Sequence, residues 1–244
     1  MLKGKISLTL GAMVIVSIFL CTIAYAQEMA VFDKEGGGRG YFMFGGNIID
    51  IKSLNSYLES KGYSKLADNF ISFGGGGYGI IGKVIIGGEG HGLIGEESTS
   101  DSYKTSIGAS YGFVNFGYIV YSTKGLSVYP LLGLGGGKMS LKIVERGTAS
   151  SFDDVLDNPE RSAKLSTGGF LLTLALGTDY LLKLGEDEKG KGGLVFGLRI
   201  GYTFAPIKGS WEMDGGIEIS GAPEIGITGP YIRLMIGGGG FGKE

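Results

Sequence analysis

Residues 194–204 alternate strictly between large apolar side chains and small or charged ones. One face carries Leu194, Phe196, Leu198, Ile200, Tyr202 and Phe204. The other face carries Val195, Gly197, Arg199, Gly201 and Thr203. Successive side chains of a β-strand point to opposite sides, so this segment predicts a strand with one continuously apolar face. A membrane-spanning β-barrel needs this arrangement, with apolar side chains towards lipid and polar ones towards a lumen.

The N-terminus has the parts of a secretory signal peptide. Two lysines precede an apolar run over residues 6–23, and Ala24-Tyr25-Ala26 supplies the small-x-small pattern that a signal peptidase recognises. We predict a signal peptide at residues 1–26, cleaved before Gln27, and export through it. The alternative is a retained membrane helix, because the apolar run is nearly long enough to cross a bilayer.

Cysteine content and charge exclude several functions for the mature chain. Cys21 is the only cysteine and lies in the predicted signal, so no internal disulfide and no thiolate metal site can form. Loss of Lys3 and Lys5 with the signal leaves 20 of the 22 basic residues against 24 acidic ones, a formal charge of −4. This balance excludes a broad basic surface for nucleic acid.

Glycine supplies 49 of the 244 residues, although 43% of the chain is hydrophobic. The glycines lie inside apolar alternating runs, as at residues 73–78, 132–138 and 236–241. Glycine weakens a strand unless close packing or strong curvature requires it. A small closed barrel does require it, because inward side chains crowd a narrow interior.

Eight strands are predicted, all in one barrel domain over residues 39–244 that follows an N-terminal segment at 27–38. Their ranges are 39–49, 70–81, 84–95, 104–121, 126–144, 169–184, 194–204 and 231–241. Gly82-Lys83 suits a two-residue type II′ hairpin. The change of phase at residues 135–137 predicts a bulge or kink. Long and short connections alternate, as expected for an outer-membrane barrel with long external loops, short periplasmic turns and periplasmic termini.

A short helix is predicted in the first long connection. Ser53 is a suitable N-cap, Leu54, Tyr57 and Leu58 share a face, and Gly62 can end the helix. The helix either forms a lid or docking element at the barrel mouth or rests on its rim as a short amphipathic segment.

From residue 39 to its C-terminus, the chain resembles the small eight-stranded outer-membrane barrels of the OmpA, OmpX and OmpW kind. Residues 129–137, Tyr-Pro-Leu-Leu-Gly-Leu-Gly-Gly-Gly, are similar to an aromatic–proline–glycine strand start common in such domains. The resemblance implies an all-β antiparallel transmembrane barrel whose partners are outer-membrane lipid and the barrel-assembly machinery. Those families usually end on an aromatic residue, whereas Phe241 is followed here by three further residues.

Five ionisable residues are predicted to point into the barrel: Glu89, His91, Asp179, Arg199 and Arg233. Charges in a confined interior must pair and hydrogen-bond, so we predict a polar network in the lumen. An alternative is a catalytic pair, in which Glu89 orients the ring of the sole histidine. Candidate nucleophiles for it are Ser72, Ser98 and Ser110.

The sequence therefore predicts a non-enzymatic, porin-like outer-membrane barrel. It would have a structural or anchoring role, or admit small apolar molecules. The alternatives are a secreted or periplasmic soluble β-protein and an outer-membrane hydrolase that uses His91. No cofactor or metal site is predicted. The string Gly90-x-Gly92-x-x-Gly95 matches a dinucleotide-binding pattern, but no apolar-periodic helix follows it.

Overall fold

Eight long strands build the protein in the computed structural model, which describes residues 36–147, 151, 153, 156, 162–187, 190–213 and 216–242. The predicted signal and most of the N-terminal segment lie outside these residues. The long strands are β1 (Gly36–Ile48), β2 (Asn69–Ile81), β3 (Val84–Gly95), β5 (Tyr103–Tyr118), β7 (Leu126–Glu145), β8 (Ser162–Asp187), β9 (Gly190–Lys208) and β12 (Gly229–Gly242). The short elements are α2 (Lys52–Ser60), β4 (Ser98–Thr99), β6 (Tyr121–Thr123), β10 (Trp211–Met213) and β11 (Ile217–Ile219).

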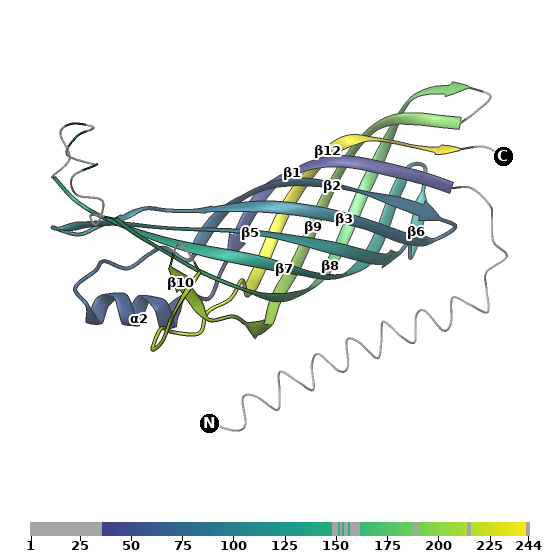
Figure 1. Cartoon of the computed structure of the whole chain (residues 1–244). Helices are drawn as coiled ribbons and strands as arrows, with labels where there is room; N and C mark the ends of the chain where they lie inside the picture. The colour runs from purple at the N-terminus through teal and green to yellow at the C-terminus, as the bar shows by residue number, and fades with distance from the viewer. Residues whose placement is uncertain are drawn as a thin grey trace. The chain divides into compact units, whose positions relative to one another are not determined.

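The eight long strands form a closed antiparallel ring (Figure 1). Each pairs with the next along the chain, β7 pairs with β8, and β12 returns to pair with β1 from Gly37↔Phe241 to Asn47↔Tyr231. Every long strand therefore has two partners and none is left as an edge. The predicted eight-stranded antiparallel barrel is confirmed.

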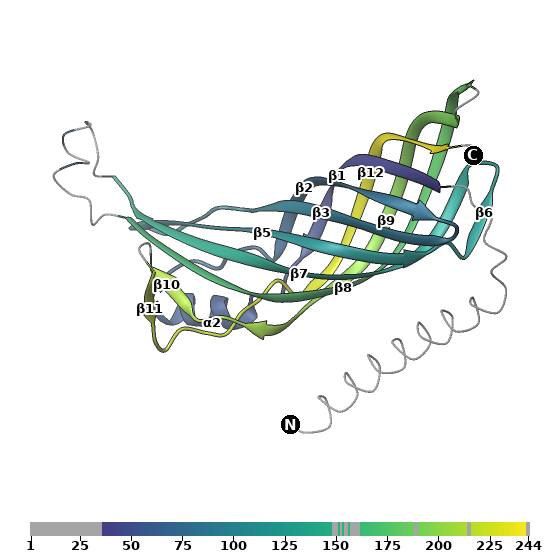
Figure 2. The same cartoon turned by 45° about the vertical axis from the view of Figure 1, so that its right-hand side comes forward.

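The connections at one end of the barrel are long and those at the other end are short, as the sequence predicted. Residues 49–68, 96–102, 146–161 and 209–228 connect strands at one end, which we call the loop end; 82–83, 119–125 and 188–189 do so at the other, the turn end. Figures 1 and 2 both show α2 and β10 at the loop end and β6 at the turn end. The Ile81↔Val84 pair confirms the two-residue hairpin, and a φ of 59° at Gly82 without a positive φ at Lys83 matches the φ pattern of a type II′ turn.

Strands β5, β7 and β8 continue beyond the ring at the loop end. Their pairing runs out to Tyr103↔Glu145 between β5 and β7 and to Val144↔Ser162 between β7 and β8, so β8 begins before the predicted residue 169. The prediction started that strand too late because residues 162–168 contain a single large apolar side chain, Leu165, and so lack the large apolar face used to find strands. We call this part of β5, β7 and β8 the extension.

The prediction of a bulge at residues 135–137 is wrong. The pairing of β7 with both neighbours passes through Gly136 without a shift, as Gly112↔Gly136 and Gly136↔Phe170. The register shifts instead lie between β8 and β9, beside Phe170/Leu172 and Lys183/Gly185. The glycines of β7 serve close packing rather than an irregular backbone.

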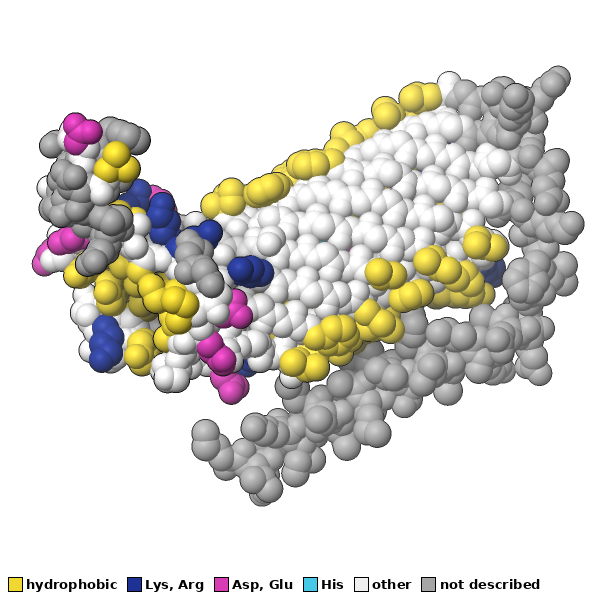
Figure 3. All heavy atoms as spheres, in the orientation of Figure 1, with side chains coloured by type: hydrophobic (Ala, Val, Ile, Leu, Met, Phe, Trp, Pro, Cys, Tyr) yellow, Lys and Arg dark blue, Asp and Glu magenta, His cyan; other side chains and the backbone are white. Residues whose placement is uncertain are grey.

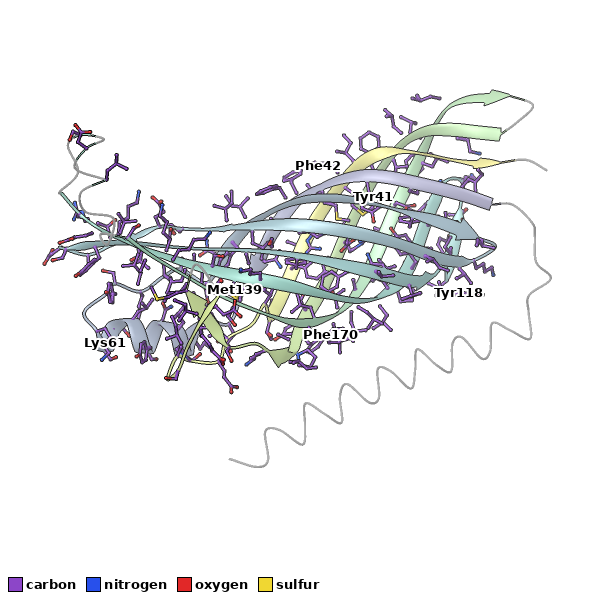
Figure 4. All side chains as sticks on the ribbon, viewed as in Figure 1. Tyr41, Phe42, Lys61, Tyr118, Met139 and Phe170 are labelled. Atoms are coloured by element: carbon purple, nitrogen blue, oxygen red, sulfur yellow. The ribbon has the colours of Figure 1, made fainter. Side chains whose placement is uncertain are left out.

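The alternation of the strands separates the outside of the barrel from its interior. In β9, Ile200 is 51% exposed and Arg199 is 1% exposed. In β1, Phe42 points away from the barrel and Tyr41 points into it (Figure 4). The predicted phases of these strands are confirmed. Among the described residues, no helix is long and apolar enough to cross a membrane.

Helix α2 is confirmed, but its predicted cap is wrong. Ser53 lies inside the first turn; Asp50 Oδ1 instead accepts the N–H of Lys52 at 3.3 Å. Leu54 and Leu58 are buried, whereas Tyr57 is 46% exposed and does not share their buried face. A tyrosine can keep its hydroxyl in water at the margin of a short helix. Hydrophobic periodicity alone therefore does not show that Tyr57 is exposed.

The glycines of the barrel wall are of two kinds. At inward positions there is no room for a side chain: a Cβ at Gly76 would lie 2.8 Å from the Cβ of Glu89, and one at Gly137 would lie 2.8 Å from that of Tyr111. At outward positions such as Gly40 a Cβ would have open space. Figure 3 shows the result on one face, a broad stretch of wall without hydrophobic or charged side chains.

We predict that Gly76→Ala lowers the free energy of unfolding by about 1–3 kcal/mol, because the added methyl overpacks the interior. Gly40→Ala is the matched control; its backbone has no positive φ and space is open, so it should be neutral or stabilising by about 0.4–1 kcal/mol. Urea unfolding of the folded barrel measures both. Equal effects would contradict the assignment of inward and outward glycines.

Candidate functional site in the barrel interior

Apolar side chains fill the interior at the loop end. The barrel contributes residues such as Phe70, Leu93 and Leu171, the segment around α2 contributes Leu54 and Leu58, and the last long loop contributes Trp211, Ile225 and Ile227. Trp211 Nε1 donates a hydrogen bond to the carbonyl of Pro223 at 2.8 Å, which holds this loop in place. The helix and the loop therefore share one hydrophobic core with the barrel and close its mouth.

A second apolar layer fills the interior at the turn end. It contains Tyr41, Met43, Tyr78, Ile80, Ile85, Ile119, Tyr129, Leu131 and Met235. Phe241 is partly buried against this layer, and the guanidinium of Arg39 lies 4.5 Å from the centre of its ring. The last aromatic residue of the final strand thus lies at an inward position, over a buried arginine.

Between the two layers, one carboxylate is shared by two arginines and a histidine. Glu89 on β3 forms an ion pair with Arg199 on β9 through Oε2. Its Oε1 lies 3.5 Å from Nη1 of Arg233 on β12 and 3.3 Å from Nε2 of His91. Arg233 Nη1 also lies 3.2 Å from His91 Nε2. The side chains of all four residues are at most 1% exposed.

Tyrosine rings and hydroxyls complete this cluster. Arg233 donates a hydrogen bond to the hydroxyl of Tyr111, and its guanidinium lies 3.7 Å from the centre of the Tyr231 ring. Arg199 lies 5.5 Å from the centre of the Tyr41 ring. Cations over aromatic rings are attracted by the ring quadrupole, more strongly where water is excluded. The two arginines are therefore held by aromatic rings as well as by Glu89.

Asp179 belongs to a separate group. Its Oδ2 accepts hydrogen bonds from the hydroxyls of Tyr78 and of Tyr129, the latter at 3.2 Å. No ion pair joins it to an arginine within the described residues. The structure thus places all five predicted residues inside the barrel, but brings together only Glu89, His91, Arg199 and Arg233.

The interior tyrosines were not assigned to the network from the sequence. They nevertheless stand at inward positions of their strands, in phase with the charged residues; they are Tyr41, Tyr78, Tyr111, Tyr129 and Tyr231. The same period-two alternation that located Arg199 would have located them. Which charged group each hydroxyl contacts depends on the arrangement of strands across the barrel. The alternation within a single strand gives no information about that arrangement.

None of the three candidate nucleophiles hydrogen-bonds to His91 in the described part of the chain. Ser72 is fully buried, and its Oγ has no hydrogen-bond partner. Ser110 is exposed at an outward position of β5, and Ser98 lies in β4 at the loop end. His91 instead lies between the carboxylate of Glu89 and the guanidinium of Arg233 in a packed interior.

No protein-family model matches the chain, and no curated protein matches it. Among solved structures, it is similar to Ail, the attachment invasion locus protein of Yersinia pestis, at 12% identity and a TM-score of 0.39, over 86% of this chain and 99% of that one. It is also similar to the outer membrane protein OprG of Pseudomonas aeruginosa, at 12% identity and a TM-score of 0.42, over 86% of this chain and 96% of that one. The closed ring of this chain follows from its own strand pairing.

We predict that Glu89→Gln destabilises the barrel more than Arg199→Met. Loss of the Glu89 charge leaves two buried arginines without a carboxylate, whereas loss of Arg199 leaves Glu89 with Arg233. Breaking a buried ion pair costs about 3–5 kcal/mol, and we expect Glu89→Gln to reach that range. The free energy of unfolding in urea measures both variants.

Asp179→Asn is the matched control, since it removes the same charge from a carboxylate bound by tyrosine hydroxyls. It should cost less than Glu89→Gln. In a double-mutant cycle, Arg199→Met should couple more strongly to Glu89→Gln than to Asp179→Asn. Equal coupling to both acids would contradict the assignment of Glu89 as the shared partner.

Proposed function

We propose that the protein is an outer-membrane barrel with a structural or anchoring role, and that its interior conducts nothing. The observation that carries the proposal is the filling of the interior along its length, by an apolar layer at each end and the Glu89 cluster between them. Eight strands leave an interior just wide enough for side chains, so such a barrel is a packed core rather than a pore.

A belt of exposed apolar side chains supports a location in a membrane. Large side chains that are 40% or more exposed occur on seven of the eight long strands, β7 being the exception; they include Phe44, Ile71, Ile86, Val114, Phe170, Leu176, Ile200 and Leu234. Soluble monomers rarely expose contiguous apolar patches larger than a few hundred Å². This belt argues against the secreted or periplasmic soluble protein, because that alternative would leave it in water.

The packed mouth favours anchoring over passage of small apolar molecules. A ligand entering from the loop end would have to displace Leu54, Leu58 and Trp211 from the core that they share with the barrel. It would then meet Arg199 and Arg233, which are almost fully buried and paired. Helix α2 therefore acts as part of the seal.

The hydrolase alternative is disfavoured by the surroundings of His91. A general base needs a nucleophile within hydrogen-bond reach, and its reacting atoms need access to substrate. His91 makes polar contacts with Glu89 and Arg233 inside the packed interior, and neither is a hydroxyl or thiol that a histidine base could activate. Its role in this proposal is structural, and outer-membrane lipid and the assembly machinery are the proposed partners.

Cysteine labelling of intact cells tests the location and the orientation. A cysteine at Ser100, at the loop end, should react with a membrane-impermeant reagent, whereas one at Lys124, at the turn end, should not. The mature chain has no cysteine of its own, so each variant reports a single position. Lys124→Cys should react after the outer membrane is permeabilised, which controls for reactivity. Equal labelling in intact cells, or a preference for Lys124, would contradict the proposed topology.

Planar bilayer recordings test the closed interior. The purified barrel should insert without producing conductance steps, because neither apolar layer leaves a continuous water path. A sixteen-stranded porin in the same bilayer is the positive control, since such barrels enclose an aqueous channel. Reproducible steps from the protein would show that the interior opens and would favour a transport function.

A further inference from the structure

The last six residues of β12 are five glycines and Phe241. These residues, 237–242, lie at the turn end, where they pair with residues 37–41 of β1 on one side and with residues 190–195 of β9 on the other. Figure 1 shows this part of β12 beside the start of β1. We call residues 237–242 the closing segment and the boundary between β12 and β1 the seam, because the ring closes between these two strands.

Side-chain contacts across the seam are few along the closing segment. Cross-strand side-chain pairs stabilise an antiparallel sheet, and glycine supplies no side chain for them. On the outward face of the seam, Gly38 is paired with Gly240, whereas nearer the loop end Phe42 is paired with Ile236. On the other side of the closing segment, Gly240 is paired with Gly192. Most of the closing segment is therefore held by backbone hydrogen bonds alone.

Phe241 is the one residue of the closing segment that has a side chain, and that side chain contacts Arg39 of β1. The ring is partly buried against the apolar layer of the turn end. The guanidinium of Arg39 lies 4.5 Å from the centre of the ring. Arg39 Nη1 also donates hydrogen bonds to the carbonyls of Gly38, at 3.1 Å, and Gly240, at 3.2 Å. Arg39 therefore contacts both the side chain and the backbone of the closing segment from the opposite strand.

Two glycines make room for the contact between Arg39 and Phe241. Arg39 is paired with Gly239, and Phe241 is paired with Gly37. A Cβ at Gly239 would lie 2.5 Å from Cδ of Arg39, and a Cβ at Gly37 would lie 2.7 Å from Cδ1 of Phe241. The guanidinium and the ring each cross the seam over a residue without a side chain, so this part of the glycine content serves the contact between them.

Arg39 stands apart from the arginines of the Glu89 cluster. It is 4% exposed, and its guanidinium forms no ion pair with the residues that the structure describes. A buried charge is costly unless neighbouring groups compensate it. For Arg39 that compensation includes the ring of Phe241 and the carbonyl of Gly240, which both lie on the opposite strand. Separation of β1 from the closing segment would remove both contacts at once.

We propose that Arg39 and Phe241 form a latch that holds the closing segment in the ring, and that the seam opens at this end when the latch is released. The opening separates residues 237–242 from residues 37–41 while the rest of the barrel stays folded. Proteins open locally where packing is sparse, at a free energy below that of global unfolding. Beyond the closing segment, Met43 is paired with Met235 and both belong to the buried apolar layer, so the seam stays closed from there to the loop end.

The latch gives the barrel a second closure. Helix α2 and the last long loop close the mouth at the loop end, whereas the latch closes the wall at the turn end. An open seam would expose Tyr41 and Met235 of the apolar layer to the surroundings of the barrel. The inference goes beyond the structural role proposed above, and it rests on the ring of strands rather than on the location of the protein.

Amide hydrogen exchange tests the latch, measured by NMR on the full mature protein in detergent micelles. In the native chain, amides that bond across the seam within residues 37–41 and 237–241 should exchange faster than those within residues 42–47 and 231–236. Their exchange should also depend less on added urea, because a local opening exposes little surface. Equal rates and equal urea dependence in the two halves of the seam would overturn the proposal without any substitution.

The variant R39M should speed exchange in the closing segment at least about tenfold, since it removes the cation over the ring and the hydrogen bond to Gly240. Exchange within residues 231–236 should change less than about twofold, because that half of the seam keeps its side-chain pairs. F241L keeps an apolar side chain but loses the aromatic face, and should speed exchange in the closing segment by a smaller factor. The matched control R146M removes an arginine at the loop end that bonds to the Ser100 carbonyl, and should leave the seam unchanged.

The double variant R39M/F241L tests whether the two residues act together. In a single latch the contact is already lost in R39M, so the double variant should exchange at the rate of R39M within about twofold. Four results would overturn the proposal: no acceleration in R39M, equal acceleration in both halves of the seam, the same acceleration in R146M, or fully additive effects in the double variant. A heat-shift gel shows which variants are folded, and the native-chain comparison decides the proposal if R39M does not fold.

Discussion

The narrow interior of an eight-stranded ring is the constraint on which the rest of the structure depends. Closure through β1 and β12 removes every sheet edge but leaves space for little more than the side chains themselves. Several large inward residues therefore have a glycine opposite them on one of the two neighbouring strands. Gly177 faces the ring of Tyr129, and Gly76 faces Glu89. The unusual glycine content follows in part from this packing, because a glycine on one neighbouring strand leaves room for a bulky tyrosine or arginine, as Gly137 does beside Tyr111 and Gly177 beside Arg199.

The charged centre of the barrel follows from the same confinement. A buried carboxylate is costly unless it is paired and hydrogen-bonded, and Glu89 meets this requirement by sharing its two oxygens among Arg199, Arg233 and His91. Asp179 meets it differently, through tyrosine hydroxyls. The apolar layers above and below exclude water and make both groups more dependent on their partners. A cluster of this kind joins β3, β9 and β12 across the interior.

The outside of the barrel is less uniform than a simple apolar belt. Part of the wall consists of outward glycines, including Gly40, Gly88 and Gly90, where a Cβ would meet no close contact. Beyond the wall, the outward face of the extension carries lysine and serine in place of apolar side chains, beginning with Lys138, two residues after the Gly136 that pairs with Phe170. The change marks the place where the surroundings of the protein change from hydrocarbon to polar groups, in the membrane location that we propose.

The sequence by itself determined the strands, which of their side chains face outward, the alternation of long and short connections, and helix α2. These features are local: period-two alternation assigned Ile200 to the outside and Arg199 to the interior without knowledge of any neighbour. Only the tertiary structure decided that Glu89, and not Asp179, is the partner of both arginines, that residues 135–137 continue a regular strand, and that α2 closes the mouth. Each of these depends on which residues face one another across the ring. That relation is set by strand register and closure, which no single segment of the chain contains.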